Sequence, residues 1–288
     1  MAHRPRLLVA LLVAGCGNSP TLIDSGAAGD GAIAVDAPGG SASAGCGRAP
    51  GVGYEVRTVT IDGVARSFGV RIPEGATATD PLPLVFVFHH RDGTIDAARA
   101  YGIEEAVAAA GDRAIVVYPQ ALAYPGEGAV GWEIGCGNYD SRFADAIYDQ
   151  ILADHCVDTR RVFATGFSWG ADMTIAYGCC RSDRIRAIAP SSGTAWGDWR
   201  AACPTHAPAL RITIGDVDGN YPVADVDAVA DHFRARNGCA ATRSPVEPAP
   251  CEASDGCSAP VVECVYPGMG HQIPPDGAAH IWAFFRAF

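Results

Sequence analysis

Ser168 stands in the stretch ATGFSWGAD, with Gly166 and Gly170 two residues to either side. The preceding RVFATG is a strand-like apolar run and the following residues show a helical pattern, so the serine falls at a strand-to-helix turn. This is the G-x-S-x-G arrangement of nucleophilic serines, in which glycines leave room for a sharp turn that exposes the hydroxyl. The start of the following helix also carries a partial positive charge that favours a developing oxyanion. In a chain with 34 glycines, an ordinary strand-to-helix turn can have the same pattern. Whether Ser168 is a nucleophile therefore depends on whether a base and an acid accompany it.

His271 is the candidate base. A serine hydroxyl is a weak nucleophile until a base removes its proton, and the base needs an acid to orient it. His271 follows the apolar run VVECVYP in a loop rich in glycine and proline. In contrast, His232 and His280 fall inside helical patterns, and His206 follows no strand.

Two aspartates are candidates for the acid. Asp216 and Asp218 directly follow the strand-like run ALRITIG, and the chain order serine, acid, histidine is that of α/β-hydrolases. The stretch DVDGN also has the acidic spacing of a calcium loop, with Asp227 at its twelfth position. A calcium loop needs a glycine where Tyr221 stands, so we disfavour that interpretation. Either aspartate fits the triad at this point.

The elements that must position these residues alternate between strand and helix patterns. The first two strand patterns meet at Asp62-Gly63, a two-residue hairpin signal. The alternation that follows predicts an α/β domain with a mostly parallel sheet and helices on both faces. Sites in such sheets lie at the carboxyl ends of the strands, where the candidate serine, acid and base all fall.

Three segments resemble secreted feruloyl esterases and the related poly(3-hydroxybutyrate) depolymerases: VDTRRVFATGFSWGADMTIAYGCC, IRAIAPSSG and GMGH. The resemblance covers residues 46–288 and implies an α/β-hydrolase fold and a serine carboxylesterase without cofactor. The implied substrate is an ester of plant cell-wall polysaccharide or a polyester. In that family the acid follows G-x-x-D-x-x-x-P, which Gly215, Asp218 and Pro222 match, so the acid role passes to Asp218.

The chain departs from the family at the oxyanion loop, where His90 replaces a glycine. By position, the backbone N–H groups of Arg91 and Trp169 would hold the oxyanion. Trp132 lies in a family-like segment and is a candidate for the substrate pocket, with simple packing as the alternative. We also expect His89 to contact substrate, with a hydrogen-bonded loop histidine as the alternative.

The cysteines indicate an exported, disulfide-stapled protein. Of the 11 cysteines, Cys16 lies in the leader region, and the other ten form an even set that predicts up to five disulfides. No Cys-x-x-Cys spacing occurs, and we expect no metal. Adjacent Cys179 and Cys180 point about 100° apart on a helix and need different partners; the resemblance suggests Cys156 for Cys179. The four cysteines from Cys239 to Cys264 are expected to staple one C-terminal region.

Charge excludes some classes of function. The formal net charge is −11, and all 21 basic residues are arginines. An acidic chain without a basic cluster repels phosphate backbones, so we expect no nucleic-acid partner. The absence of lysine also argues against Schiff-base chemistry. We expect a monomer.

The N-terminus predicts export. A basic start and the apolar run LLVALLVA are typical of a signal peptide, over residues 1–15. VAGC resembles a bacterial lipobox, with Cys16 as the lipidated residue. A Gly-, Ala- and Ser-rich tether follows over 16–45, and the esterase domain spans 46–288. We therefore expect an extracytoplasmic protein that contacts the membrane only through its lipid anchor, or is secreted.

Two other hypotheses remain open. A catalytically silent, polysaccharide-binding surface lipoprotein is favoured by His90 alone and opposed by an intact serine, acid and histidine. A peptidase on the same fold would share that order. Hydrolysis of p-nitrophenyl acetate separates an esterase from the silent binding protein.

Replacement of Cys16 by serine should release the protein from the cell envelope, because the thioether that carries the lipid could not form. Wild type and Cys16→Ser are expressed in a bacterial host and fractionated. Wild type in the soluble extracellular fraction, without lipid on its N-terminal peptide, would favour plain secretion.

Overall fold

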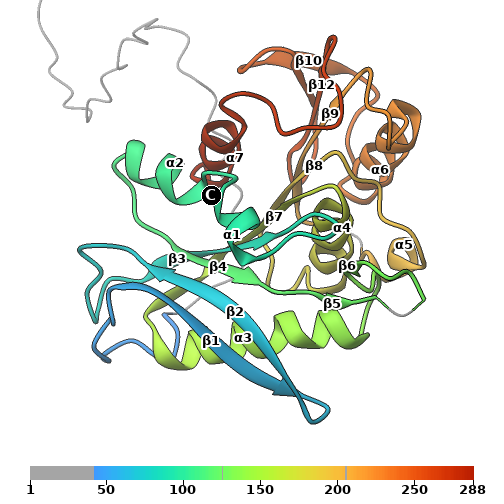
Figure 1. The fold of residues 1–288 in the computed structure, drawn as a ribbon. Helices are drawn as coiled ribbons and strands as arrows, with labels where there is room; N and C mark the ends of the chain where they lie inside the picture. The colour runs from blue at the N-terminus through green and yellow to red at the C-terminus, as the bar shows by residue number, and fades with distance from the viewer. Residues whose placement is uncertain (1–41, 125, 205) are drawn as a thin grey trace, which may run out of the picture. The chain divides into compact units, whose positions relative to one another are not determined.

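A ten-stranded sheet organises the part of the chain that this computed structural model describes, residues 42–124, 126–204 and 206–288. Its spatial order is β1-β2-β4-β3-β7-β8-β9-β12-β11-β10 (Figure 1). The strands are β1 (Gly53–Ile61), β2 (Val64–Ile72), β3 (Leu82–Phe88), β4 (Ile115–Pro119), β7 (Val157–Phe167), β8 (Ala187–Ser191), β9 (Ala209–Gly215), β10 (Arg243–Val246), β11 (Cys251–Ser254) and β12 (Val261–Tyr266). A separate small pair joins β5 (Leu122–Ala123) to β6 (Val130–Gly131).

The central strands are parallel, as the sequence predicts. β4, β3, β7, β8, β9 and β12 pair in parallel, and the edges are antiparallel. The hairpin at Asp62-Gly63 is confirmed, with Ile61 opposite Val64. The edge strands β10 and β11 have no clear alternation of apolar residues, and the sequence did not predict them. The carboxyl ends of β7, β9 and β12 therefore open on one edge of the sheet.

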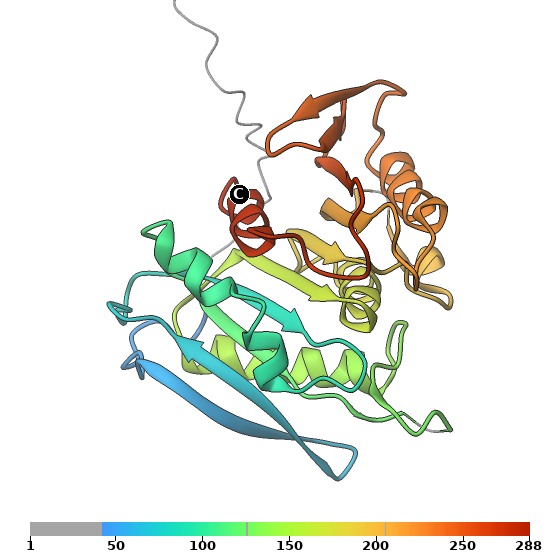
Figure 2. The same ribbon diagram turned by 45° about the horizontal axis from the view of Figure 1, so that its top comes forward.

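Helices cover both faces of the sheet (Figure 2). Side chains alternate across β3: Phe86 and Phe88 pack on one core, and Val85 and Val87 on the other. The first core includes residues of α3 (Tyr139–Asp154), α4 (Trp169–Cys180) and α6 (Val223–Arg236), with α5 (Trp199–Ala202) beside α4. The second core includes residues of α1 (Ile95–Arg99), α2 (Ile103–Ala109) and α7 (Gly277–Phe285).

Residues 95–111, IDAARAYGIEEAVAAAG, have one continuous helical pattern, but they form two helices in the structure. Gly102 adopts a left-handed backbone with φ +83° between α1 and α2, which ends the first helix and starts the second in a new direction. A Cβ at this position would lie 3.6 Å from that of Ala278 in α7. The helical pattern is present on both sides of Gly102, and the left-handed backbone of this residue divides it.

The folded region begins before Cys46. Ser43 is buried; its hydroxyl donates to the carbonyl of His155 at 2.6 Å and accepts from the N–H of Val157 at 2.9 Å. The N–H of Gly45 donates to Leu152 at 2.8 Å. Residues 42–45 therefore pack on the end of α3, although the sequence pattern assigned them to the expected tether. The predicted signal peptide and Cys16 lie outside the described residues.

Five disulfides join the ten cysteines of the described region: Cys46–Cys156, Cys136–Cys180, Cys179–Cys203, Cys239–Cys257 and Cys251–Cys264. The separate partners of Cys179 and Cys180 are confirmed, and so is the C-terminal staple. The suggested Cys156–Cys179 pair is wrong. Cys156 begins the turn into β7, where residues 42–46 lie against it, and it bonds to Cys46 instead.

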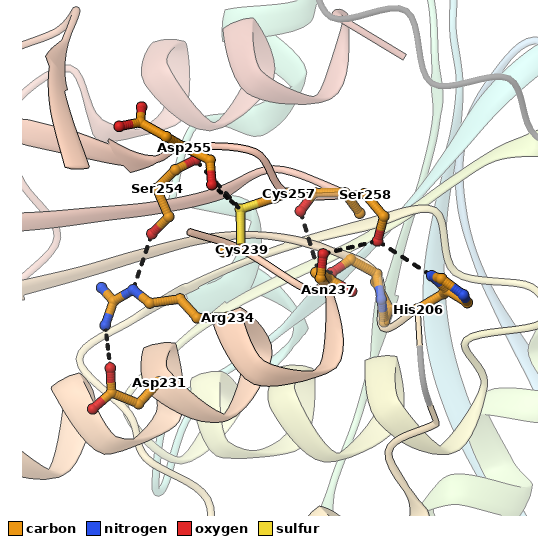
Figure 3. The surroundings of a disulfide bond; sticks show 11 residues. His206, Asp231, Arg234, Asn237, Cys239, Ser254, Asp255, Cys257 and Ser258 are labelled. Atoms are coloured by element: carbon orange, nitrogen blue, oxygen red, sulfur yellow. Dashed lines mark hydrogen bonds and ion pairs between the residues drawn. A yellow bond between two sulfur atoms is a disulfide. The ribbon is translucent and has the colours of Figure 1, made fainter. Parts of the chain in front are cut away.

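The Cys239–Cys257 bond fastens the edge strands to α6 (Figure 3). Next to it, the Arg234 guanidinium donates to the Ser254 hydroxyl at 3.0 Å and to Asp231 at 2.6 Å. The Ser258 hydroxyl donates to the carbonyl of Asn237 at 3.0 Å. A short edge of the sheet with little apolar surface is thus held by covalent and polar contacts.

No helix in the described ranges combines the length and the apolar character needed to cross a membrane.

Non-reducing peptide mapping should recover a Cys46–Cys156 peptide and one peptide in which the Cys179–Cys180 segment is linked to both Cys203 and Cys136. The Cys46–Cys156 bond closes a segment of 110 residues and Cys251–Cys264 one of 13. Loop entropy then predicts losses of about 4 to 5 kcal/mol for Cys46→Ser/Cys156→Ser and about 3 kcal/mol for Cys251→Ser/Cys264→Ser. Denaturant unfolding measures both, and the reverse ranking would contradict the loop-length argument.

Candidate active site

The turn at Ser168 is strained and tightly enclosed. Ser168 has φ +56° and ψ −125°, a left-handed backbone that only a few per cent of residues other than glycine adopt. A Cβ on Gly166 would lie 2.4 Å from the carbonyl oxygen of Gly170, and one on Gly170 would lie 2.1 Å from that of Phe88. Both glycines are therefore required where β7, α4 and the end of β3 meet. The turn presents the Ser168 hydroxyl at the carboxyl edge of the sheet.

The structure brings the three predicted catalytic side chains into one hydrogen-bonded row. Nε2 of His271 lies 2.9 Å from Oγ of Ser168. Nδ1 of the same ring lies 2.9 Å from Oδ2 and 3.1 Å from Oδ1 of Asp218. Asp218 follows β9 and His271 follows β12, the neighbouring strand. This arrangement allows the imidazole to accept the serine proton while the carboxylate holds the ring.

Asp218 is held in its ionised form. Burial by itself would raise the pKa of Asp218, but hydrogen bonds from His271 and from the N–H groups of Asn220 and Tyr221 outweigh it and lower the pKa. The side chain has no exposed surface. Asp216 lies elsewhere: it is exposed, and its carboxylate accepts from the N–H of Gly268 at 2.6 Å. Of the two aspartates, Asp218 is the one that touches His271.

Arg91 and Trp169, the predicted oxyanion donors, both line the same cavity as Ser168. Among the described residues, neither backbone N–H donates to a protein acceptor. His90, the residue in place of the family's glycine, is accommodated: Tyr101 Oη accepts from its N–H at 3.0 Å and lies 2.7 Å from its Nδ1. Its ring packs edge-on to Phe167. The imidazole at position 90 is thus anchored beside the cavity.

The cavity has a volume of about 660 Å³ and an aromatic wall. Trp169 lies 5.4 Å, between ring centres, from Tyr124 and from Trp196. Trp196 is 43% exposed, although it is a large apolar side chain. The guanidinium of Arg91 lies 5.7 Å from the centre of the Trp169 ring and 3.6 Å from the Glu127 carboxylate. This aromatic wall, formed by Tyr124, Trp169 and Trp196, suits a flat apolar group.

The structure corrects the predicted substrate contacts of Trp132 and His89, because both side chains are buried. Trp132 and His89 are fully buried and do not line the cavity. Trp132 instead supports the wall from behind, since Nε1 of Trp169 donates to its carbonyl at 2.9 Å and its own Nε1 donates to the carbonyl of His89 at 2.8 Å. Burial lowers the pKa of His89 to about 4, and its Nε2 accepts from the N–H of Ala121. Both are packing residues in this conformation.

Sequence patterns missed the other wall residues and one buried acid. Tyr124 and Trp196 lie in loops whose path depends on the rest of the fold. Asp172 is fully buried in the first turn of α4, where its place in the helix pattern gave no reason to select it. The only available signal was an acidic residue inside an otherwise apolar helix. In the described part of the chain, no three histidine, cysteine or acidic side chains form a group that could hold a metal ion.

Two curated relatives show high coverage of the chain. It is 31% identical over 276 residues to "Probable feruloyl esterase C" of Aspergillus niger, spanning 86% of this chain and 92% of the relative. It is 32% identical over 272 residues to "Feruloyl esterase C" of Emericella nidulans, with the same two shares. No family model matches the chain.

Solved esterase structures share the fold. An acetyl xylan esterase from Aspergillus awamori gives a TM-score of 0.61 at 17% identity, covering 81% of this chain and all of that one. A feruloyl esterase module from Clostridium thermocellum complexed with sinapinate gives 0.57 at 13% identity, with 85% and 89% covered. The predicted α/β-hydrolase fold is confirmed.

Substitution of the two aspartates should have unequal effects. Asp218→Asn should lower kcat on p-nitrophenyl acetate by roughly 10³- to 10⁴-fold, because the amide would misorient the imidazole. Asp216→Asn should change kcat by less than about three-fold, since an amide oxygen can still accept the Gly268 N–H. Steady-state kinetics with a thermal melt of each variant checks this, and the opposite ranking would assign the acid to Asp216.

Proposed function

Since the chain belongs to the family of the fungal feruloyl esterases C, we propose that it hydrolyses esters of aromatic acids on plant cell-wall polysaccharide. Family membership makes it a carboxylic ester hydrolase. The observation that carries the finer proposal is the row Asp218–His271–Ser168 beside an aromatic-walled cavity.

The proposed reaction proceeds in two halves. Oγ of Ser168 attacks the ester carbonyl carbon while Nε2 of His271 takes the hydroxyl proton, and Asp218 stabilises the imidazolium that forms. The tetrahedral intermediate collapses as the C–O bond to the sugar breaks, and His271 returns the proton to the leaving alkoxide. Water then attacks the acyl-serine with the same base, and the carboxylic acid leaves. Neither half needs a metal or an organic cofactor.

The oxyanion would form at the edge between β3 and α4. We assign its stabilisation to the backbone N–H groups of Trp169 and Arg91, which lie in the same cavity wall as the serine. The N-terminal end of α4 adds its partial positive charge. Removing one such donor typically costs two to three orders of magnitude in kcat.

The aromatic wall favours a phenolic acyl group over other esters. A hydroxycinnamoyl ring can stack on Trp196 or Tyr124, with about 0.5–1.5 kcal/mol of ring–ring attraction beyond area burial. Acetyl and hydroxybutyrate groups have no ring and would leave this surface unused. We accordingly rank feruloyl esters first, and polyhydroxybutyrate remains the polyester alternative.

The proposed setting is outside the cytoplasm. Five disulfide bonds join ten cysteines, and such bonds form and persist in an oxidising compartment. Attachment through Cys16 would keep the esterase on the cell envelope, where it would meet polysaccharide or its soluble fragments; lipid chains gain about 0.8 kcal/mol per buried methylene.

A substrate panel tests the proposal. Wild type should hydrolyse methyl ferulate faster than acetylated xylan or hydroxybutyrate oligomers, and Ser168→Ala and His271→Ala should each lose about 10⁵-fold in kcat. The double variant should fall little further, because the two groups act as a unit. Near-normal turnover in either single variant would refute the triad.

Trp196→Ala separates the acyl preference from the chemistry. Its exposed ring contributes little to the core, so the variant should fold normally. KM for methyl ferulate should rise roughly five-fold, by the ring–ring energies above, and KM for p-nitrophenyl acetate should stay within two-fold. Equal KM changes for both esters would argue against an aromatic acyl pocket.

A further inference from the structure

A second buried carboxylate lies close to the proposed triad and has no part in the mechanism above. Asp172 is in the first turn of α4, and its side chain is fully buried. Its Oδ1 accepts from the N–H groups of Thr194 and Ala195, both at 2.7 Å, and its Oδ2 accepts from the Tyr221 hydroxyl at 2.7 Å. Three donors on one buried carboxylate are the environment of an anion.

The loop after β8 is shaped around this carboxylate. Ser192 and Ala195 have φ of +53° and +52°, in the left-handed region that costs residues other than glycine about 1–3 kcal/mol. Gly193 between them allows the close approach, since a Cβ there would lie 2.5 Å from that of Ala171 and 3.0 Å from Oδ1 of Asp172. The charge-assisted hydrogen bonds to Asp172 offset this strain.

Tyr221 carries the contact from Asp172 to His271. Its ring stacks on the His271 imidazole, with centres 5.7 Å apart and planes 29° apart. The Phe167 ring also packs against the imidazole, with centres 4.7 Å apart and planes 33° apart. The backbone N–H of Tyr221 also donates to Oδ1 of Asp218 at 3.1 Å. One residue therefore touches the base, the acid and the second carboxylate.

The ionisable groups around the imidazole are few. Asp218 hydrogen-bonds to its Nδ1, and the Tyr221 phenol stacks on it and donates to Asp172. The His90 ring packs edge-on to Phe167. Burial, followed by the neighbouring His271, lowers the pKa of His90 and favours its neutral form. Burial raises the pKa of Asp172 to about 6, although its hydrogen bonds act in the opposite direction. Because this pKa lies below 7, the carboxylate is an anion at neutral pH.

We propose that Asp172 is a positioning residue for His271: it holds Tyr221 against the imidazole and supplies a second negative charge that stabilises the imidazolium formed during catalysis. Because it acts on the base, the inference rests on the proposed function. It adds a carboxylate from the nucleophile's own helix to the one supplied by the loop after β9.

Asp172→Asn is the decisive variant. The amide keeps the geometry, because its oxygen can accept from Thr194 and Ala195 and its nitrogen can donate to the Tyr221 oxygen, but the charge is gone. On p-nitrophenyl acetate we expect kcat to fall about three-fold, the equivalent of half a pKa unit, and KM to stay within two-fold. The acid limb of the pH–kcat/KM profile should move to lower pH by roughly half a unit, since loss of a nearby anion makes an imidazolium less stable.

Tyr221→Phe tests the connection without changing the ring. Loss of the hydroxyl should lower kcat by about five-fold. The double variant with Asp172→Asn should have about the same kcat as the less active of the two single variants, because both substitutions break one connection. Tyr177→Phe is the matched control. Tyr177 lies in α4, the helix of Asp172, and its buried hydroxyl donates to a different carboxylate, that of Asp145, at 3.3 Å. It should keep both kcat and the pH profile even if its melting temperature falls.

Asp172→Asn with wild-type kcat and an unmoved acid limb would overturn the proposal. If that variant does not fold, wild-type kcat in Tyr221→Phe overturns it equally. Failure of the proposed function is a separate result, because it would appear as activity in Ser168→Ala, whatever happens at Asp172.

Discussion

The left-handed backbone at Ser168 is the constraint on which the rest of the site depends. It exists because β7, the start of α4 and the end of β3 approach each other with no side chain between them, at Gly166 and Gly170. Such a conformation costs about 1–3 kcal/mol and persists only when the surrounding structure enforces it. The parallel sheet supplies that enforcement, and it also places the loops that carry Asp218 and His271 beside the serine.

Helix α4 is anchored at both ends. At its start, Asp172 binds the loop after β8 and, through Tyr221, the loop after β9. At its end, Cys179 and Cys180 bond to Cys203 and Cys136. A helix fixed in this way can hold the serine hydroxyl within hydrogen-bonding distance of the imidazole, a distance that proton transfer requires. Asp172 at the start of α4 and the disulfides at its end thus both fix the position of the helix that follows Ser168.

The cavity gains its character from segments that are far apart in sequence. Tyr124 comes from the connection between β5 and β6, Trp169 from the start of α4 and Trp196 from the loop after β8. Trp132 holds the middle ring from behind through its carbonyl, although the ring of Trp132 itself is out of reach of any substrate. The preference we propose for aromatic acyl groups therefore depends on loop packing, while the chemistry depends on strand ends.

Strand and helix patterns in the sequence predicted the fold class, the turn at Ser168 and the strand ends that carry His271 and the pair Asp216 and Asp218, because parallel strands bring their carboxyl ends to one edge whatever the details of packing. The choice of Asp218 came from the family resemblance. It could not determine which side chains face the cavity. Trp132 and Trp196 look alike in sequence, yet one is buried and the other exposed. Cysteine pairing was equally out of reach, since Cys156 meets Cys46 only when residues 42–46 pack on the end of α3. The contact between Asp172 and Tyr221 joins residues 49 apart in the chain, and only the tertiary structure, which closes the loop after β9 over α4, brings them together.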